Sequence, residues 1–596
     1  MKTKTCIASI NPTIGDWSGQ LLLVRQIIDA ARKADARLLV LPELALGTPD
    51  ARDLYFMPST AQYAEQVLAD IATQTKGMTV VCGMPLFHDG NLYNVAAVLH
   101  DGMTVAFVPK CLPPCPCEED RWFARWDFSK TELHLGARIG KFDRTTAEME
   151  NLDVFLGELS LCPEVERGAV LVHLCDHPFS PNQYRRALSE ALDYSRHRGV
   201  TVIHSELLGC LDGTHIYDGG GYIVSRGGIE TLAPRFVLDR PFVVTTSDDT
   251  PKKAFDPSLA HFKKSGSCPV TDDDYVFCEI ELAIVLGLHD YMRRAGVEKL
   301  CLALSGGRDS AMIAILVSRL VALREPDLDE AGRRQKLRDL LVTAYLPSRA
   351  SSSSGTQTAA LALAQELGFE CPVIPVADLA VNAVTSVEDV LGRAMTWEQD
   401  DLALQNVQSR ARSLVIWTLA NAHGAMLLTT GNMSEAAVGY ATMDGDASGC
   451  LDPIGNLPKT LVSRWLAWAR EFHGIEALDA VFAQPPSAEL RPLDKKQSDE
   501  DDLMPYAVLD AYMDCFFVRH MSPREMWQYA RTNLAEFYTS PDDIRRDIRR
   551  FIQLTTRSQW KRIRFANGFR ILDFDLSEDL RWPCLQAPFV RACDEM

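Results

Sequence analysis

A glycine pair between a strand-like segment and a helix-like segment is the first feature of this sequence that could do chemistry. The segment KLCLAL runs directly into Ser305-Gly306-Gly307-Arg308-Asp309-Ser310, and AMIAILVSRL follows. Adjacent glycines at a helix N-terminus let backbone N–H groups converge on a bound anion. Ser305 and Ser310 add hydroxyl groups, and Asp309 adds a carboxylate that could bind a metal ion. The pattern predicts a phosphate-binding loop rather than a turn without a ligand.

Strand-like and helical segments alternate around this loop. The segments KLCLAL, LLVTAYLP, CPVIPV and AMLLTT are typical of strands, and helical windows such as AMIAILVSRLVALRE and QTAALALAQEL separate them. This order is typical of βαβ units in a parallel sheet. We therefore expect residues 275–596 to form a doubly wound α/β domain.

The first part of the chain is also predicted to be a layered α/β domain, over residues 1–234. Its strand-like segments include the hairpin NVAAVLHDGMTVAFVPK with an Asp101-Gly102 turn. The others are TCIASI, LLVLPEL, TVVCGMPLF, GAVLVHL, VTVIHSELLG and GGYIVS. Residues 235–274 lose this periodicity and gather Pro, Ser, Lys and Asp, which predicts a connector.

Composition narrows the classes of function. The chain has 596 residues, which excludes a single small module, and its net charge of -19 disfavours general binding to nucleic acids or anionic membranes. No run reaches the roughly 18 uninterrupted apolar residues of a membrane span, and YVFCEIELAIVLGL carries two glutamates, which favours an amphipathic helix. The N-terminal segment resembles a first strand rather than a signal peptide.

The cysteines are too sparse and irregular for a disulfide scaffold. There are 16 of them in this long chain, which suits a reducing compartment, so we expect a cytoplasmic protein. Cys111, Cys115 and Cys117 lie close together, but no CxxC pair or matching histidine is nearby. Zinc binding is therefore not favoured, and these residues are interpreted as loop cysteines.

Several blocks of the second half resemble a known family. SGGRDS resembles the SGGxDS signature of the ATP pyrophosphatase superfamily, which activates a carboxyl or carbonyl oxygen as an adenylate. NVQSRAR (406–412) and TTGNMSEAAVGYATMDGD (429–446) resemble blocks of the NAD synthetases. PKT, PSAEL, QSDEDDLMPYAVLD and QWKRIRF follow in that family's order. The resemblance covers most of the second half.

The NAD synthetase resemblance implies two sets of binding residues. The residues implied for ATP are Ser305, Gly306, Gly307, Asp309, Ser310, Thr430, Lys459 and Ser487. Those implied for deamido-NAD are Asn406, Arg410, Glu435, Tyr440, Asp446 and Lys561. Asp309 and Glu435 offer hard oxygen ligands for Mg²⁺, which neutralises a pyrophosphate leaving group, and Lys459 offers a mobile positive charge.

Three positions depart from the family's pattern. Gln405 replaces a usual glutamate, Asp444 replaces a usual tyrosine, and Arg308 adds a bulky cation inside the phosphate loop. We expect the nucleotide contacts to differ in detail.

The first half resembles the nitrilase superfamily, an αββα sandwich with a catalytic Glu, Lys and Cys. The blocks that carry this likeness are INPTIGDWSGQ, LLVLPELALG, VAFVPKCLPP, GAVLVHL, HPFSP and YDGGG. The resemblance implies that Glu43 is a general base, that Lys110 stabilises an oxyanion and that Glu119 orients Lys110.

Cys162 in GELSLCPE is the expected nucleophile of this domain. It best fits the family's cysteine at the end of a strand, followed by acidic residues. Pro163-Glu164 and a short spacing to Gly168-Ala169 depart from the pattern, and Cys175 aligns with a small residue. Glutaminase activity could therefore be weakened or lost.

The two resemblances together imply a glutamine-dependent NAD synthetase. Ammonia released from glutamine by the first domain would amidate deamido-NAD in the second, with ATP as co-substrate and Mg²⁺ as cofactor. The family also implies a homo-oligomer formed through the synthetase domain. Three alternatives remain: an ammonia-dependent synthetase with a degenerate glutaminase domain, a carbon–nitrogen hydrolase with a nucleotide-sensing domain, and a non-catalytic nucleotide-binding scaffold.

Overall fold

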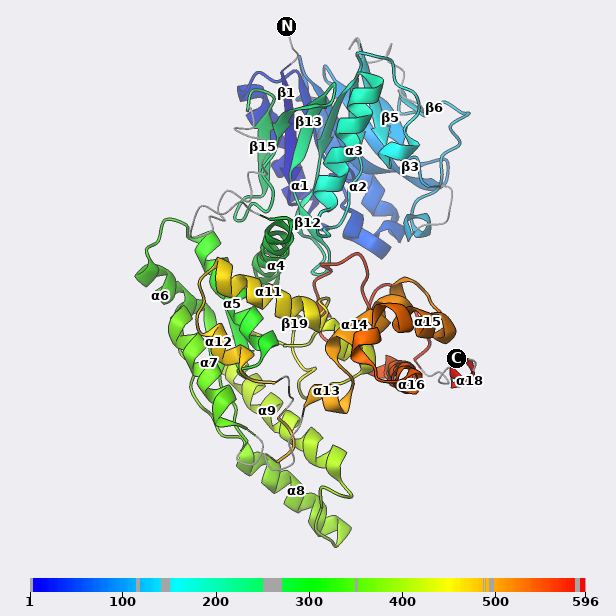
Figure 1. Ribbon diagram of the computed structural model, residues 1–596. Helices are drawn as coiled ribbons and strands as arrows, with labels where there is room; N and C mark the ends of the chain where they lie inside the picture. Colours follow the sequence, from blue (N-terminus) through cyan, green and yellow to red (C-terminus); the bar gives the residue numbers. More distant parts are fainter. Residues whose placement is uncertain are drawn as a thin grey trace. The chain divides into compact units, whose positions relative to one another are not determined.

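The computed structural model of the chain divides into two compact units (Figure 1). The first contains Met1–Lys263 and Cys278–Asp290, and the second contains Lys264–Phe277 and Tyr291–Met596. The structure describes residues 4–113, 118–140, 151–249, 271–348, 352–485, 487, 489–492, 498–584, 590–594 and 596. Each unit has its own sheets and its own core.

Two sheets form the centre of the first unit. The larger, in spatial order, contains β15 (Phe242–Thr246), β1 (Thr5–Ile10), β2 (Leu38–Val40), β3 (Thr79–His88), β4 (Asn91–His100), β5 (Met103–Pro109), β7 (Ala137–Ile139) and β6 (Glu132–His134). The smaller contains β14 (Gly228–Leu232), β13 (Gly221–Ser225), β10 (Thr201–Ser205), β9 (Val170–Leu174) and β8 (Leu152–Leu156). A separate ribbon pairs β11 (Leu208–Cys210) with β12 (Ile216–Asp218).

Alternation along the strands gives each sheet two apolar faces, and so the first unit has four layers. Inner-facing residues of both sheets, such as Val40, Val98 and Val172, share one core. The outer face of the larger sheet packs on α1 (Trp17–Lys33) and α2 (Pro58–Ala72). The outer face of the smaller sheet packs on α3 (Gln183–Arg198), as Figure 1 shows. The predicted αββα sandwich is confirmed.

Some local predictions for the first unit need correction. Residues 235–274 are not connector throughout, because β15 lies within them and pairs antiparallel with β1. Its sequence FVVTT is short and adjoins polar residues, so periodicity alone did not reveal it. The strand β8, with the sequence LDVFL, was also not predicted. The remaining short elements are η1 (Pro49–Phe56), η2 (Glu118–Arg121) and η4 (Leu159–Leu161).

The second unit is built on one parallel sheet. Its spatial order is β17 (Leu341–Ala344), β16 (Lys299–Ala303), β18 (Ala425–Leu428), β19 (Leu451–Asp452) and β20 (Asn567–Gly568). One face packs on α8 (Ala377–Leu391) and α9 (Asp401–His423). The expected doubly wound α/β architecture is present, but CPVIPV forms only an isolated bridge between Val373 and Tyr345.

Helices make up most of the rest of the second unit, and one of them, α4, also runs through the first. They are α4 (Asp272–Ala295), α5 (Arg308–Arg324), α6 (Glu330–Leu340), α7 (Ser354–Leu367), α10 (Met433–Val438), α11 (Lys459–Phe472), α12 (Leu478–Phe482), α13 (Asp499–Asp502), α14 (Tyr506–Met513), η7 (Asp514–Val518), α15 (Pro523–Asn533), η8 (Ala535–Phe537), α16 (Pro541–Arg557), α17 (Gln559–Arg562) and α18 (Val590–Cys593). The segment YVFCEIELAIVLGL is helical, as expected, within α4. Within the described parts of the chain, none of the helices has the length and apolarity needed to cross a bilayer.

Candidate functional site

The predicted phosphate loop connects β16 to α5 in the second unit. Gly306 has a φ of 80°, in the left-handed region that favours glycine. A Cβ atom at this position would lie 2.1 Å from the carbonyl oxygen of Thr356, which is a backbone atom. Glycine is therefore required at residue 306 both by the backbone conformation and by the close approach of α7.

Two serine hydroxyls fix the shape of the loop. Ser310 Oγ accepts from the backbone N–H of Ser305 at 3.2 Å and donates to the carbonyl oxygen of Gly307 at 3.2 Å. Ser305 Oγ accepts from the backbone N–H of Gly307 at 3.2 Å. Because Ser310 is buried, its role is to position the loop, while Ser305 and Gly307 line the cavity described below.

A lysine and two carboxylates meet beside the loop. Lys459, the first residue of α11, forms ion pairs through Nζ with Asp309 Oδ2 and, at 3.0 Å, with Glu435 Oε1. Asn432 donates to Asp309 Oδ1 at 3.3 Å, and its own Oδ1 accepts from the backbone N–H of Glu435 at 3.0 Å, which caps α10. Three helix N-termini therefore bring the expected metal ligands and the expected cation together.

The electrostatics of this cluster favour the presence of further positive charge. Burial, together with Asp309, raises the pKa of Glu435 to about 8, although Lys459 acts against this shift. Burial also raises the pKa of Asp452 to about 7, and Asp452 Oδ1 has no hydrogen-bond partner among the described residues. Asp309 and Glu435 share one ammonium group, and Asp452 lies close enough to Asp309 for their charges to interact. Hard oxygen donors in this arrangement fit Mg²⁺.

A cavity of about 750 Å³ contains this cluster. Nine of the predicted residues line it: Ser305, Gly307, Asp309, Thr430, Glu435, Tyr440, Asp446, Lys459 and Ser487. The cavity also reaches the carboxyl ends of β16 and β18, where ligands bind in open parallel sheets. Its size, and the charged side chains set in a largely apolar lining, suit nucleotide substrates.

Five predicted residues lie outside the cavity lining: Gly306 and Ser310, which shape the phosphate loop, and three that act on the cavity wall. Asn406 Oδ1 accepts from the hydroxyl of Thr442 at 2.9 Å, and Arg410 Nε donates to the carbonyl oxygen of Met443 at 3.1 Å. Lys561 Nζ donates to the carbonyl oxygens of residues 439 and 441 at 2.7 and 2.8 Å. All three therefore fix the segment 439–446, which carries Tyr440 and Asp446.

Several cavity residues escaped the sequence analysis, and Arg412 is the clearest. It lines the cavity and donates through Nη2 to the carbonyl oxygen of Glu489 at 3.0 Å. Arg410 and Arg412 are two residues apart on α9, so they cannot face the same side of the helix. In the structure, Arg412 is the one of the two that lines the cavity. The two-residue spacing of the arginines in NVQSRAR could have indicated that only one of them faces the cavity.

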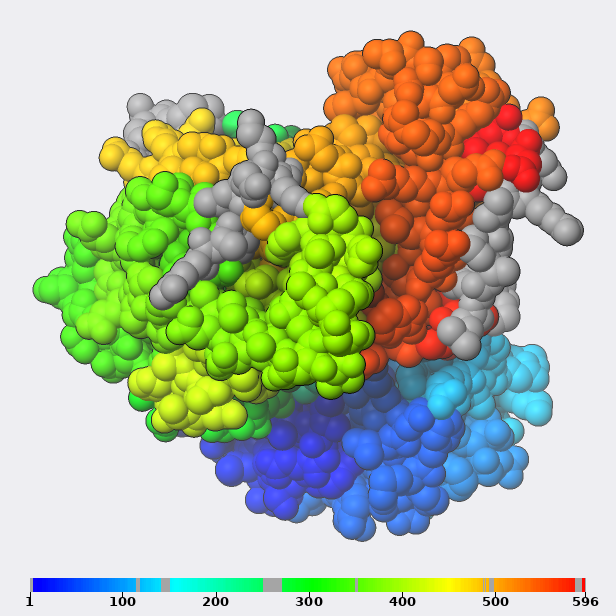
Figure 2. Space-filling view, turned by 90° about the horizontal axis from the view of Figure 1, so that it is seen from below, coloured from blue at the N-terminus to red at the C-terminus, as the bar shows by residue number. Residues whose placement is uncertain are grey.

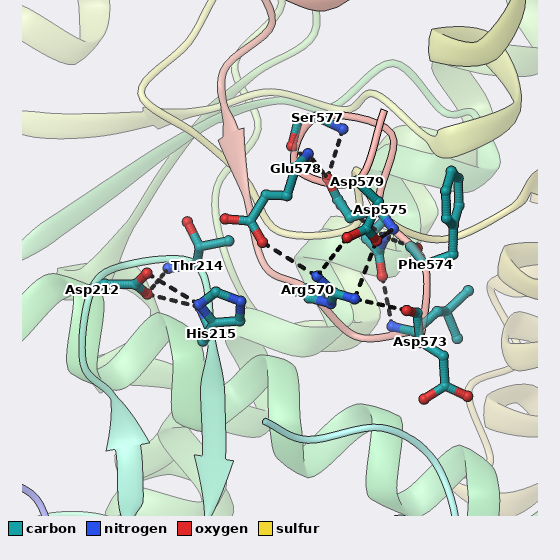
Figure 3. A network of polar contacts seen from close by, with 12 residues as sticks. Asp212, Thr214, His215, Arg570, Asp573, Phe574, Asp575, Ser577, Glu578 and Asp579 are labelled. Carbon is teal, nitrogen blue, oxygen red and sulfur yellow. Dashed lines mark hydrogen bonds and ion pairs between the residues drawn. The ribbon is translucent and has the colours of Figure 1, made fainter. Parts of the chain in front are cut away.

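A C-terminal loop also contributes to the cavity wall. Asp575, Leu576 and Ser577 line the cavity, and Asn456 donates to Asp575 Oδ2 at 2.8 Å. Arg570 lies among acidic side chains of this loop, as Figure 3 shows, and pairs with Asp579 at 3.1 Å. No motif indicated this loop, because its residues become part of the site only through tertiary contacts.

In the first unit, the predicted acid and base residues meet. Lys110 Nζ donates to Glu43 Oε1 at 2.6 Å and to Glu119 Oε1. Glu43 also accepts from Asn94 Nδ2 at 2.7 Å and from the backbone N–H of Asp176 at 3.0 Å. Burial lowers the pKa of Lys110, but Glu43 and Glu119 outweigh it and raise this pKa above its ordinary value. The lysine is therefore charged and held between two carboxyl groups.

Cys162 does not take the position that we expected for it. The strand β8 ends at Leu156, and Cys162 follows the short turn η4 rather than the end of a strand. Its Sγ accepts from the hydroxyl of Tyr194 at 3.4 Å, and it packs with apolar residues between the smaller sheet and α3. Its electrostatic partners include Asp153 but neither Glu43 nor Lys110.

The thiol that meets the Glu43–Lys110 cluster belongs to Cys175. Burial and Glu43 raise its pKa well above the ordinary value, and Lys110 acts in the opposite direction. Cys175 immediately follows β9, and the sequence analysis aligned it with a small residue of the family's pattern. Cys175, and not Cys162, is therefore the thiol with Glu43 and Lys110 among its electrostatic neighbours. The position of Cys175 at the end of the strand-like segment GAVLVHL could have indicated this, but the comparison of motifs favoured Cys162.

A second cavity, of about 250 Å³, adjoins this thiol. Its lining includes Cys175, His177, Glu158, Arg186 and Glu190. Of the three loop cysteines considered for zinc, Cys111 packs partly buried against an apolar cluster, and Cys115 and Cys117 lie outside the described residues.

Comparison with known proteins agrees with this division of the chain. The family model for carbon–nitrogen hydrolase matches residues 6–111, and the model for NAD synthase matches residues 280–562. A glutamine-dependent NAD(+) synthetase of Synechocystis sp. is 30% identical, with 98% of each chain covered. The enzyme of Thermotoga maritima is 28% identical at the same coverage.

A solved structure is similar over nearly the whole length. The crystal structure of a glutamine-dependent NAD(+) synthetase from Cytophaga hutchinsonii is 25% identical, has a TM-score of 0.84 and covers 99% of both chains. Since both halves match in one order and at full length, the chain belongs to the glutamine-dependent NAD(+) synthetase family.

Proposed function

We propose that this protein forms NAD by ATP-dependent amidation of deamido-NAD, with ammonia taken from glutamine. The observation that carries the proposal is the phosphate loop joined to the Asp309–Glu435–Lys459 cluster inside one cavity. The nicotinate carboxylate of deamido-NAD reacts with ATP to give an adenylate and pyrophosphate. Ammonia then displaces AMP and leaves the nicotinamide group of NAD.

Each part of the cavity has a role in this reaction. The backbone N–H groups around Gly306 bind phosphate oxygens at the N-terminus of α5. Lys459 stabilises the negative charge that moves onto the departing pyrophosphate. Asp309 and Glu435 would hold Mg²⁺, which supplies further positive charge to the pyrophosphate. The segment 439–446, with Tyr440 and Asp446, contributes to the deamido-NAD site.

The nitrogen source is assigned to the first unit. Glu43, Lys110 and Glu119 form a charged cluster beside a thiol and a small cavity, which suits hydrolysis of a carboxamide such as that of glutamine. The family comparisons support the same source. We place the protein in the cytoplasm, which agrees with the free thiols of all the cysteines that the structure describes.

The test is NAD formation from deamido-NAD, ATP and Mg²⁺, with ammonium or glutamine as nitrogen source. We expect NAD, AMP and pyrophosphate in equal amounts with either source. Lys459→Gln should lose activity with both sources, whereas Arg464→Gln, an exposed cation on the same helix, should keep it. Amide hydrolysis without any ATP requirement would instead indicate a hydrolase with a sensing domain, and nucleotide binding without products would indicate a scaffold.

We also propose that the synthetase unit associates with a second copy. Helix α8 buries only Ala377 and Ala380. Its apolar side chains Val381, Val387 and Val390 are exposed, the last by 86%. Figure 2 shows this yellow-green region at the surface. Val390→Asp should shift the molar mass measured by light scattering toward that of one chain, and an unchanged mass would exclude α8 from the interface.

A further inference from the structure

The first observation concerns a cation at the start of α5. Arg308 is the first residue of this helix, directly after Gly307 of the phosphate loop, and it lines the same cavity. The N-terminus of a helix carries partial positive charge, so a cation in its first turn is unfavourable and an anion there is favourable. The sequence therefore places an arginine where the helix dipole opposes it, and a bound anion would offset that cost.

The second observation is the position of the Arg308 guanidinium group. The helix α11 packs against α5, and Arg308 Nη1 donates to the hydroxyl of Ser463 on α11 at 3.0 Å. Ser463 lies four residues after Lys459, and residues at this spacing share one face of a helix. The guanidinium group therefore lies against the face of α11 from which Lys459 reaches the cavity.

The third observation is that donors of this guanidinium group are left over. Its Nε is buried and has no hydrogen-bond partner within the described parts of the chain. Among the same residues, the hydroxyl of Ser463, a neutral group, is the acceptor that the side chain uses. An N–H group that is buried without an acceptor costs free energy, and an incoming acceptor removes this cost. Arg308 is therefore prepared to bind an anion.

The fourth observation is that the other cations of the cavity are already paired. Lys459 forms ion pairs with two carboxylates, and Arg491 forms ion pairs with two others. Arg412 and Arg562 donate to backbone carbonyl oxygens. Among the lining residues that the structure describes, Arg308 is the one cation that bonds to neither a carboxylate nor a carbonyl oxygen. Its charge is therefore available to a substrate.

We propose that Arg308 binds the β- and γ-phosphates of ATP and holds the pyrophosphate that leaves. This assignment rests on the proposed function and adds a residue to its ATP site, at the unspecified position of the SGGxDS pattern. The planar guanidinium group presents paired N–H donors that match two phosphate oxygens.

The reaction makes this contact stronger as it proceeds. A nicotinate oxygen bonds to the α-phosphorus of ATP as the bond from that phosphorus to the bridging oxygen breaks. The electron pair of the broken bond passes to the pyrophosphate, so its oxygens gain negative charge. A cation that touches these oxygens therefore stabilises the transition state more than it stabilises bound ATP.

Binding of pyrophosphate tests this contact without any turnover. In calorimetric titrations of the full chain with pyrophosphate and Mg²⁺, Arg308→Met should bind about 10- to 10²-fold more weakly than the wild type, because one charged pairing is lost. AMP, which lacks the β- and γ-phosphates, should bind both proteins equally. Equal pyrophosphate affinities would overturn the proposal, and an equal weakening of both ligands would show that Arg308 only maintains the shape of the site.

Two variants of α11 provide matched controls. Arg464→Met removes an exposed cation from the residue next to Ser463, and it should bind pyrophosphate as the wild type does. Ser463→Ala removes the hydroxyl that positions the guanidinium group, and it should weaken pyrophosphate binding less than Arg308→Met does. A loss of affinity in Arg464→Met as large as that in Arg308→Met would show a general effect of charge and would contradict a direct contact.

Kinetics with ammonium as nitrogen source separate this proposal from the proposed function. Arg308→Met should lower kcat/KM for ATP by at least about 10-fold and leave the KM for deamido-NAD unchanged. If the wild type forms NAD and the variant matches it in kinetics and in pyrophosphate binding, the assignment of Arg308 fails while the proposed function stands. If the wild type binds pyrophosphate through Arg308 but forms no NAD, the proposed function fails while the contact stands.

Discussion

Replacement of Gly306 by alanine tests how the phosphate loop is built. The added Cβ would meet the backbone carbonyl oxygen of Thr356 at 2.1 Å, and the residue would keep a φ of 80°. An alanine in the left-handed region costs about 1–2 kcal/mol. A carbon and an oxygen atom in van der Waals contact lie more than about 1 Å farther apart than this. Relief of the overlap therefore costs a further ~1–3 kcal/mol.

The strain can appear in two measurable places. If the loop keeps its shape, the second unit loses about 2–5 kcal/mol of unfolding free energy, and the urea midpoint falls by roughly 1 M or more. If the loop moves away from α7 instead, the phosphate-binding N–H groups are displaced, and a loss of ~3 kcal/mol corresponds to ATP binding weaker by about 10²-fold.

Gly296 provides the matched control. It has a φ of 65°, and a Cβ at this position would meet nothing within 4 Å, so Gly296→Ala carries the conformational cost without the overlap. We expect Gly296→Ala to lower the urea midpoint slightly and to leave ATP binding unchanged. Calorimetric titration of ATP and urea unfolding of the full chain measure both effects. Equal behaviour of the two variants in both assays would refute the proposed reason for Gly306.

Two further predictions concern the stability of the first unit. Burial lowers the pKa of His173 to about 3, so below pH 6.5 the unfolded chain binds a proton that the folded chain excludes. Stability should therefore fall with decreasing pH by up to about 1.4 kcal/mol per unit, and His173→Gln should flatten this slope in urea titrations. Arg235→Met should destabilise the unit by about 3–5 kcal/mol, because the buried Glu279 carboxylate loses the guanidinium group that lies 2.7 Å from it. A loss of unfolding free energy smaller than that of an exposed Arg→Met variant would contradict this prediction.

The layers and the synthetase site were largely predictable because local patterns determine them. Alternating apolar strands predicted both sheets of the sandwich, and the strand–glycine–helix pattern predicted the loop around Gly306. Asp309, Glu435 and Lys459 were identified from ordered motifs, and each lies at or near a helix N-terminus that directs it into one cavity.

The first site was harder to predict because it depends on which strand ends lie side by side. β8 and β9 are parallel neighbours, so residues after both strands reach the same edge of the sheet. A motif comparison considers only the order of residues along the sequence, and it therefore favoured Cys162. In the structure, Cys162 follows the turn η4 and packs toward α3. The contact between Cys175 and His177 became visible only in three dimensions.

The sequence also did not show which face of a helix lines the cavity. On α9, Arg410 and Arg412 differ by only two positions, yet one fixes a neighbouring segment and the other lines the cavity. The residues 575–577 carry no motif and reach the cavity through the Asn456 contacts. Such contributions depend on tertiary packing, which the sequence pattern does not encode locally.

The central claim is that one chain transfers the amide nitrogen of glutamine to deamido-NAD at the expense of ATP. The most direct test supplies glutamine labelled with heavy nitrogen in its side-chain amide, together with unlabelled ammonium, deamido-NAD, ATP and Mg²⁺. Mass spectrometry of the product then identifies the source of the nitrogen. The account predicts NAD with heavy nitrogen in its carboxamide and one AMP formed for each NAD. NAD that contains only unlabelled nitrogen, or AMP formation without NAD, would contradict it.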